Sequence, residues 1–172
     1  ALEAAHGLQR FTLNANIERL NTLGYPALVT FQLGGDTGVR RLAYLGRVGN
    51  IGLFGSKDLL QIPLDVIDPV WDRTATLLWK NFESLPETLA RHDRGEAVMW
   101  LQVILRQMGF LNELEAPLYG PQTEKAVKQF QRVHELETTG KLDRQTQLFL
   151  YNHLDAYPIP KLADEGEPQP TG

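Results

Sequence analysis

Apolar residues near the start of the chain recur at the spacing of a short helix. Within residues 14–24, Ile17 and Leu20 share one face, and polar residues separate them. Asn14 is the expected N-cap, because its side chain can accept a hydrogen bond from the first turn. Gly24 is the expected end, since glycine readily takes the left-handed conformation that closes many helices. We therefore predict one helix in this stretch.

In the residues that follow, runs of β-branched and apolar residues are separated by turn residues. This pattern is typical of strands joined by turns. The expected strands are residues 27–33, 39–48, 51–54, 59–64 and 74–79. Residues 34–38 and the Gly49-Asn50 pair are the expected turns. Pro63 places the fourth run at an edge or marks its end, because proline has no N–H to donate to a ladder. Residues 64–71 are expected to form one or two helical turns.

The two halves of the chain differ in their pattern. Residues 1–85 are predicted to form a small antiparallel β meander with one or two helices, with Trp71 and Trp79 in its core. Residues 95–154 change to helical spacing, and the expected helices are residues 96–108, 121–135 and 143–154. Short connections between three such helices are typical of a compact bundle. The predicted fold class is therefore α+β, a meander followed by a three-helix bundle.

Two segments carry neither pattern. Residues 86–94 are polar and charged, and we predict a linker there. Residues 155–172 combine prolines with acidic residues and hold few apolar side chains. Burial in this tail cannot offset the backbone entropy of about 1–2 kcal/mol per ordered residue. We expect a mostly disordered tail, with Tyr157 and Ile159 as its points of attachment.

Composition narrows the class of protein. The chain has 172 residues, of which 42% are hydrophobic and 22% are charged, as in ordinary globular domains. Its formal charge of −4 gives no general attraction to nucleic acid or to anionic lipid, so neither is an expected partner. No apolar run approaches the roughly 18 residues of a membrane-spanning helix.

Candidate catalytic chemistry is sparse. Cysteine is absent, which excludes a cysteine nucleophile, a disulfide and a thiolate metal site. The four histidines show no HxH or HExxH pattern and are interpreted as surface or helix-end residues. Glu18, Asp65 and Glu83 are candidate carboxylates, but nothing in the sequence pairs them. We therefore predict no enzyme, no metal site and no cofactor in this region.

A weak internal repeat marks the starts of the second and third predicted helices. Residues 118–123 and 141–146 both place Gln-Thr just after a capping position. Thr123 and Thr146 then fall at about the third residue of each helix. At that position a hydroxyl can reach exposed backbone groups or a ligand, while the methyl group faces the core.

Residues 95–154 resemble the three-helix peptidoglycan-binding domain that many bacterial cell-wall enzymes carry. The residues that match its pattern are Gly95, Val98, Leu101, Gln102, Leu105, Gly109, Tyr119, Gly120, Pro121, Gln122, Thr123, Ala126, Val127, Phe130, Gln131, Leu136, Gly140, Leu142, Thr146 and either Leu150 or Leu154. The sequence departs from the pattern where Ala116-Pro117 and Thr139-Gly140 replace Asp-Gly pairs, and where Asp143 replaces a glycine. These departures lie at the loops to which the resemblance assigns the ligand.

The resemblance and the chemistry of helix ends together suggest a site at the start of the second helix. Unpaired N–H groups and the positive end of the helix dipole can hold a stem-peptide carboxylate of peptidoglycan. The candidate ligand-binding residues are Tyr119, Gly120, Thr123 and Gln131, with Thr146 as a secondary candidate. Glycine lets a ligand approach the backbone, and the hydroxyl and amide groups offer hydrogen bonds. In the alternative interpretation, these residues only cap the helix, fill the core and satisfy the loop backbone.

Residues 20–31 resemble a step in the papain-like peptidases that process bacteriocin leaders, where a helix and a proline-led strand precede a hairpin. In that family the return strand of the hairpin starts with the catalytic histidine. Here Arg40, Arg41 or Leu42 stands at that place. Arginine cannot act as a general base near neutral pH, because its pKa exceeds about 12. The resemblance implies a degenerate module, a pseudo-peptidase.

The order of these modules is similar to the periplasmic end of the GspA (ExeA) family, the inner-membrane ATPases of type II secretion. The passages 68–71 and 76–80 contribute to this resemblance. In that family an ATPase module and a membrane helix come first, so the resemblance implies a periplasmic piece of a longer inner-membrane protein. It also implies peptidoglycan and a GspB-like protein as partners, with a role in secretin assembly through the cell wall. A homo-oligomer is left open.

Three functions fit the sequence. The first is a non-catalytic peptidoglycan-binding region of a type II secretion assembly protein, and it is the function that we predict. The second is a protein-interaction module that has lost peptidoglycan affinity, which the departures at Ala116, Pro117 and Asp143 favour. The third is the targeting part of a cell-wall hydrolase, although the chain has no zinc motif and no catalytic cysteine.

Overall fold

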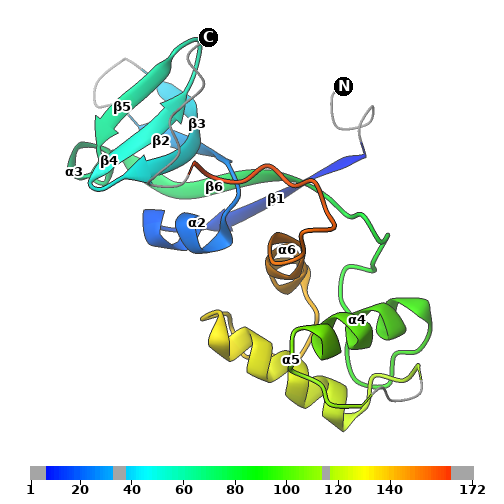
Figure 1. Ribbon diagram of the computed structural model, residues 1–172. Coiled ribbons are helices and arrows are strands. Elements are labelled where there is room, and N and C mark those ends of the chain that lie inside the picture. The colour runs from blue at the N-terminus through cyan, green and yellow to red at the C-terminus, as the bar shows by residue number, and fades with distance from the viewer. Residues whose placement is uncertain (1–6, 33–37, 114–116, 164–172) are drawn as a thin grey trace. The chain divides into compact units, whose positions relative to one another are not determined.

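The change from strands to helices divides the chain into two units. The computed structural model describes residues 7–32, 38–113 and 117–163 (Figure 1). Contacts group residues 1–80 with 158–172 in the first unit and residues 81–157 in the second. The predicted turn residues 34–37, the departure at Ala116 and the tail residues 164–172 lie outside the described residues.

The first unit is built on one antiparallel sheet. Its six strands are β1 Leu8–Asn14, β2 Ala27–Gln32, β3 Val39–Val48, β4 Ile51–Gly55, β5 Leu59–Pro63 and β6 Trp71–Lys80. They lie in the order β1-β6-β2-β3-β4-β5, so β2 to β5 form the predicted meander and β6 returns beside β2. β5 is an edge strand that ends at Pro63, as predicted. The sequence did not predict β1, which pairs with β6 far along the chain and buries no residue completely.

The helix of the first unit begins later than predicted. Helix α2 spans Ile17–Leu23, and its N-cap is Asn16, whose side chain accepts a hydrogen bond from Arg19 N at 2.8 Å. The predicted cap, Asn14, is instead the last residue of β1. Gly24 closes the helix in the left-handed conformation at φ 74°, as predicted. The short helix α3, Leu64–Ile67, follows β5.

The last strand begins earlier than its pattern indicates. β6 starts at Trp71 instead of residue 74, and an irregularity in its pairing with β2 lies between these positions. Arg73 takes a positive φ of 63° there, and its guanidinium group forms a bidentate ion pair with Asp68 at 2.7 and 2.8 Å. Polar residues at a bulge interrupt the alternation that marks a strand. Trp71 and Trp79 are 5% and 2% exposed, which confirms their predicted place in the core.

The second unit contains the three predicted helices, α4 Glu96–Gln107, α5 Pro121–Val133 and α6 Arg144–Asn152. Asp143 is the N-cap of α6, and its carboxylate accepts from Thr146 N at 2.8 Å, as predicted. Gly109 follows α4 in the left-handed conformation at φ 79°. α4 packs against α5 (Figure 1). Each helix buries one face, which is apolar except for Gln102 on α4 and for Thr123 and Gln131 on α5.

The segment 86–94, the predicted linker, is largely exposed but is anchored to the helical unit at two points. Leu89 is buried, and its backbone exchanges two hydrogen bonds with Leu142, at 3.1 and 2.8 Å. A second backbone bridge joins Arg94 to Leu118. The segment therefore packs as part of the helical unit, because its few apolar side chains and its backbone both find partners far along the chain.

Residues 155–163 of the tail, which the sequence predicts to be mostly disordered, make contacts with the rest of the chain. Leu162 N donates to Gly24 O at 3.1 Å, and Ala163 N donates to Leu45 O at 2.8 Å, both within the first unit. In the second unit, the Tyr157 ring lies 4.9 Å from the rings of Phe82 and Tyr151, centroid to centroid, which confirms its docking. Backbone hydrogen bonds to distant loops supply order that composition does not reveal.

Candidate functional site

The start of α5 is the place where sequence and resemblance locate a ligand. Gly120 is the N-cap, in an extended conformation, and no side chain caps this end. Pro121 occupies the first helical turn, as predicted. The loop before it is fixed by backbone hydrogen bonds from Tyr119 N to Asp93 O at 2.9 Å and from His92 N to Tyr119 O at 3.1 Å. The helix therefore starts from a rigid backbone.

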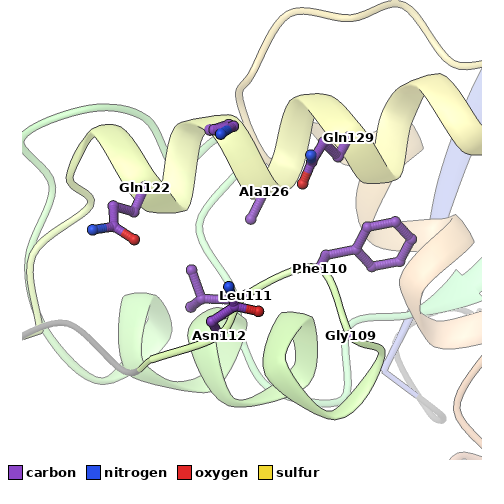
Figure 2. Close-up of a pocket in the computed structure, with 8 residues that line it drawn as sticks. Gly109, Phe110, Leu111, Asn112, Gln122, Ala126 and Gln129 are labelled. Atoms are coloured by element: carbon purple, nitrogen blue, oxygen red, sulfur yellow. The ribbon is translucent and has the colours of Figure 1, made fainter.

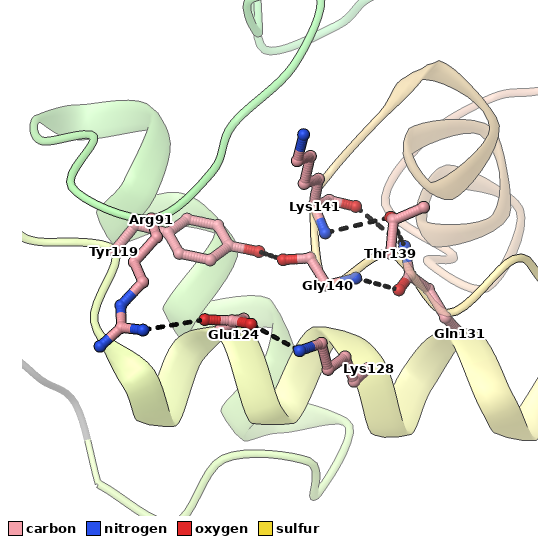
Figure 3. Close-up of polar contacts among 8 residues, drawn as sticks. All are labelled: Arg91, Tyr119, Glu124, Lys128, Gln131, Thr139, Gly140 and Lys141. Atoms are coloured by element: carbon pink, nitrogen blue, oxygen red, sulfur yellow. Dashed lines mark hydrogen bonds and ion pairs between the residues drawn. The ribbon is translucent and has the colours of Figure 1, made fainter.

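Tyr119 ties this loop to the loop before α6. Its side chain is completely buried, and its hydroxyl donates to Gly140 O at 2.7 Å (Figure 3). Burial raises the pKa of the Tyr119 phenol well above its ordinary value, and nearby carboxylates, Glu124 first, raise it further. The phenol is therefore a neutral hydrogen-bond donor between two loops.

Replacing Tyr119 with phenylalanine tests whether this residue holds the loops or holds a ligand. The ring keeps its packing, but Gly140 O loses its donor, so the helical unit should lose about 1–2 kcal/mol of unfolding free energy. Calorimetric unfolding of the whole chain measures that loss. A variant with unchanged stability and reduced binding to cell-wall sacculi would show instead that the hydroxyl contacts the ligand.

Gln131 of α5 organises the second loop. Its Nε2 group lies 3.0 Å from Thr139 Oγ1, 2.9 Å from Lys141 O and 3.1 Å from Thr146 Oγ1. Its Oε1 atom accepts from Gly140 N at 2.8 Å (Figure 3). One buried amide therefore holds residues 139–141 and the first turn of α6 in place.

The internal repeat has a structural counterpart. Gln102 of α4 donates to Thr123 Oγ1 at 3.0 Å, and Gln131 of α5 donates to Thr146 Oγ1 at 3.1 Å. Each threonine is the third residue of its helix, as the repeat predicted. Thr146 also donates to the capping carboxylate of Asp143 at 2.8 Å. In both copies, a glutamine on one helix fixes the start of the next helix.

The structure brings the five predicted site residues into one region, but it gives their side chains partners inside the fold. Tyr119, Thr123 and Gln131 have no exposed surface, and Thr146 is 1% exposed. Gly120 is buried as a cap. Geometry therefore supports the alternative interpretation for these side chains, which hold the loops. A ligand at this end of α5 would meet the residues around them.

Charged side chains cover the outer surface of this region. Glu124 is paired with Lys128 at 2.5 Å and with Arg91 at 3.8 Å (Figure 3). The hydrogen bond from Lys128 is the largest cause that lowers the pKa of Glu124. Gly140, at φ 70°, lies against the side chain of Lys128. A Cβ atom added at Gly140 would lie only 2.6 Å from Lys128 Cε, which shows how closely the two residues pack. Glu124 is shared by two cations, so this group of three side chains keeps one net positive charge.

A groove opens beside α5, on the side of the loop that follows α4. It has a volume of about 270 Å³. The residues that line it are Gly109, Phe110, Leu111, Asn112, Gln122, Lys125, Ala126 and Gln129. Figure 2 shows Ala126 of α5 facing Leu111 of the loop, with Gln122 and Gln129 on either side. The groove combines an apolar floor with a polar rim.

Sequence reasoning did not single out this groove. A signal was present, since Gln122, Lys125 and Gln129 recur at helical spacing on the exposed side of α5. Polar residues at this spacing also describe any solvated helix face. Only the loop at 109–112, folded against that face, turns it into a recess.

The candidate carboxylates do not assemble into one site. Glu18 and Asp65 line one surface hollow of the first unit, of about 490 Å³, together with Arg47 and Arg73. Glu83, in the second unit, accepts a hydrogen bond from the Tyr157 hydroxyl at 2.6 Å. Among the residues that the structure describes, no three acidic or histidine side chains lie close enough to hold a metal ion.

Within the same residues, no helix has the length and apolar character to cross a membrane.

Two histidines meet at the ends of α5 and α6. The ring centroids of His134 and His153 lie 4.3 Å apart, beside Phe130 and Phe149. The Nδ1 atom of His153 lies 2.8 Å from Phe149 O. Burial lowers the pKa of His134 below 6.5, and the neighbouring His153 lowers it further.

Acid should therefore weaken the helical unit through His134. A pKa that is lower in the folded chain means that the unfolded chain binds the proton more readily. The stabilisation is complete above about pH 6.5 and is lost as the pH falls through the lower, folded-state pKa. The urea midpoint of the wild-type chain should fall between about pH 7.5 and pH 5.5 by more than that of a His134→Gln variant. Equal pH dependence in the two proteins would contradict this assignment.

The helical unit carries the sequence pattern of a known class of domain. Residues 94–150, which include α4, α5 and most of α6, match the family model described as "Putative peptidoglycan binding domain". The resemblance noted from the sequence is thereby confirmed for this part of the chain.

About half of the chain is similar in sequence to a secretion pathway protein, and its fold is similar to that of a periplasmic domain. It is 27% identical over 84 residues to "Putative general secretion pathway protein A" of Escherichia coli K12, a match that covers 49% of this chain but only 17% of that protein. Its fold is similar to the crystal structure of a periplasmic domain of the EpsAB fusion protein of the Vibrio vulnificus type II secretion system. That comparison has a TM-score of 0.52 and 19% identity, and it covers 91% of this chain and 78% of the other.

Proposed function

We propose that this chain is a non-catalytic, peptidoglycan-binding region of a type II secretion assembly protein of the GspA (ExeA) kind. The observation that carries this proposal is the match of residues 94–150 to the peptidoglycan-binding family model. The segment forms three helices, and buried glutamines on α4 and α5 hold the starts of α5 and α6, which supports the proposal. The exposed surface of α5 then offers a wall fragment a rigid, polar platform.

The proposal extends to location and partners. It places the chain in the periplasm, attached through an upstream membrane helix of a longer protein, and gives it a GspB-like protein as partner. The support is the similarity of the chain to a general secretion pathway protein A and to a periplasmic domain of an EpsAB fusion protein. The role that follows is to engage the cell wall so that the secretin ring can be assembled through it.

The first unit is proposed to have no peptidase activity. The helix, the proline-led strand and the hairpin of the papain-like resemblance are present as α2, β2 and β3. Arg40, Arg41 and Leu42 lie on β3, opposite β2, where the resemblance requires a histidine. An arginine there keeps its proton and cannot accept one from a nucleophile.

A second candidate function is a protein-interaction module that keeps the fold without binding the wall. The burial of Tyr119, Thr123 and Gln131 favours it, because those side chains cannot reach a ligand without local rearrangement. The two functions make opposite predictions for binding to purified cell wall.

Co-sedimentation with purified sacculi tests the proposal. The whole chain should pellet with sacculi and release no soluble muropeptides on prolonged incubation. A chain that stays in the supernatant would favour the interaction module. Release of muropeptides that stops on substitution of one carboxylate, such as Glu18→Gln or Asp65→Asn, would show a hydrolase instead.

A further inference from the structure

The groove beside α5 has the composition of a site for an amphipathic ligand. Its floor contains the buried side chains of Leu111 and Ala126, and Phe110 adds a half-buried ring. Its rim carries three amides, Asn112, Gln122 and Gln129, and one ammonium group, Lys125. Small-molecule sites typically combine an apolar surface with a few convergent polar groups.

The charge of Lys125 distinguishes the groove from the surface around it. Lys128, one turn away on α5, is paired with Glu124. Lys125 is exposed and makes no ion pair with any residue that the structure describes. No acidic side chain lines the groove. An anionic group that enters the groove therefore meets the ammonium group of Lys125, which has no acidic partner among the described residues. The ammonium group of Lys128 is instead already paired with Glu124.

The amides of the rim also differ from those of the interior. The side-chain amides of Gln102 and Gln131 form short hydrogen bonds that hold loops in place. The side chains of Gln122 and Gln129 point from the exposed face of α5 and form no hydrogen bond within the described part of the chain. Amide groups both donate and accept, so they can match the N-acyl and peptide amides of a ligand.

We propose that this groove binds a muropeptide end, with Lys125 holding a free carboxylate and the rim amides holding its N-acyl or peptide groups. This inference rests on the proposed function and names the part of the wall that is recognised. The groove volume of about 270 Å³ fits one sugar ring or a short piece of stem peptide, which its apolar floor supports. A plain neutral sugar would leave the ammonium group unused.

The affinity of the whole chain for soluble muropeptides tests the proposal. The probes are a disaccharide-tetrapeptide with free carboxylates, the same compound with its carboxylates amidated, and a chitin oligosaccharide, which has none. Wild-type protein should bind the free acid about tenfold more tightly than the amidated form, because a charge-assisted hydrogen bond contributes strongly to binding. Lys125→Met should reduce the affinity for the free acid by about tenfold and remove the preference.

Lys128→Met is the matched control, since it removes the same charge from the same helix outside the groove. It should change the affinity by less than about twofold, provided both variants unfold at the temperature of the wild-type chain. Equal affinity of wild-type and Lys125→Met proteins for the free acid would overturn the groove assignment. If that result came with sacculus binding intact, the proposed function would survive. If the wild-type chain bound neither sacculi nor any probe, the proposed function itself would fail.

Discussion

Replacing Gln131 with alanine is expected to lower the unfolding free energy of the helical unit by about 3 kcal/mol. The side chain makes four hydrogen bonds in a fully buried position, and removing it leaves Gly140 N and Lys141 O without their partner. Each buried polar group left unsatisfied costs about 1–3 kcal/mol. Urea unfolding of the whole chain, followed by far-ultraviolet circular dichroism, measures the loss.

Gln129→Ala provides the control for this experiment. The two glutamines lie two residues apart on α5, but Gln129 is exposed and its truncation should change stability by less than about 0.5 kcal/mol. A Gln131→Ala protein as stable as the wild type, but unable to pellet with sacculi, would contradict the structural role and return Gln131 to the ligand site.

Trp79→Ala is expected to have the largest effect in the first unit, a loss of about 4 kcal/mol that leaves this unit largely unfolded. Trp79 is 2% exposed and lies on β6, the strand that pairs with both β1 and β2. Truncation would leave an indole-sized cavity near the end of β6, opposite Gln9 of β1, and the surrounding structure would relax only partly to fill it. Thermal unfolding of the whole chain should show one transition lost or moved to low temperature.

Leu78→Ala is the comparison for this prediction. Leu78 is the adjacent residue on the opposite face of β6 and is 37% exposed, so its truncation should cost about 1 kcal/mol or less. Equal losses from the two substitutions would show that the Trp79 face is not the core of the sheet.

Local chemistry predicts much of this fold from the sequence. Gly24 and Gly109 close helices by taking positive φ values, Asp143 caps α6, and Pro63 ends an edge strand. Each of these signals acts within a few residues of its own position. They locate the ends of elements without reference to the rest of the chain.

Several differences between the expected and the observed structure share one cause, which is pairing between distant residues. β1 exists because it pairs with β6, and the predicted linker is ordered because Leu89 pairs with Leu142. Leu162 likewise finds Gly24 O. No composition or periodicity within a segment reports where its backbone N–H and C=O groups will find partners.

The candidate site illustrates the same limit for side chains. The sequence predicted a site at the start of α5, with residue types suited to hydrogen bonding, and it remains a prediction that this region binds a ligand. The sequence could not decide which of Gln129 and Gln131 is available to a ligand. Only the folded loops bury Gln131 and place Gln129 at the groove. The difference between Lys125 and Lys128 is readable from the sequence, because Glu124 lies four residues before Lys128 on the same helix and pairs with it.

The helical unit, and not the sheet unit, is proposed to contact the wall. Titration of the isotope-labelled whole chain with a soluble disaccharide-tetrapeptide, followed amide by amide with nuclear magnetic resonance, tests this most directly. Shift changes should concentrate in residues 109–112 and on α5, with the sheet of residues 8–80 unaffected. Changes confined to the sheet unit, or none at saturating ligand, would contradict the account.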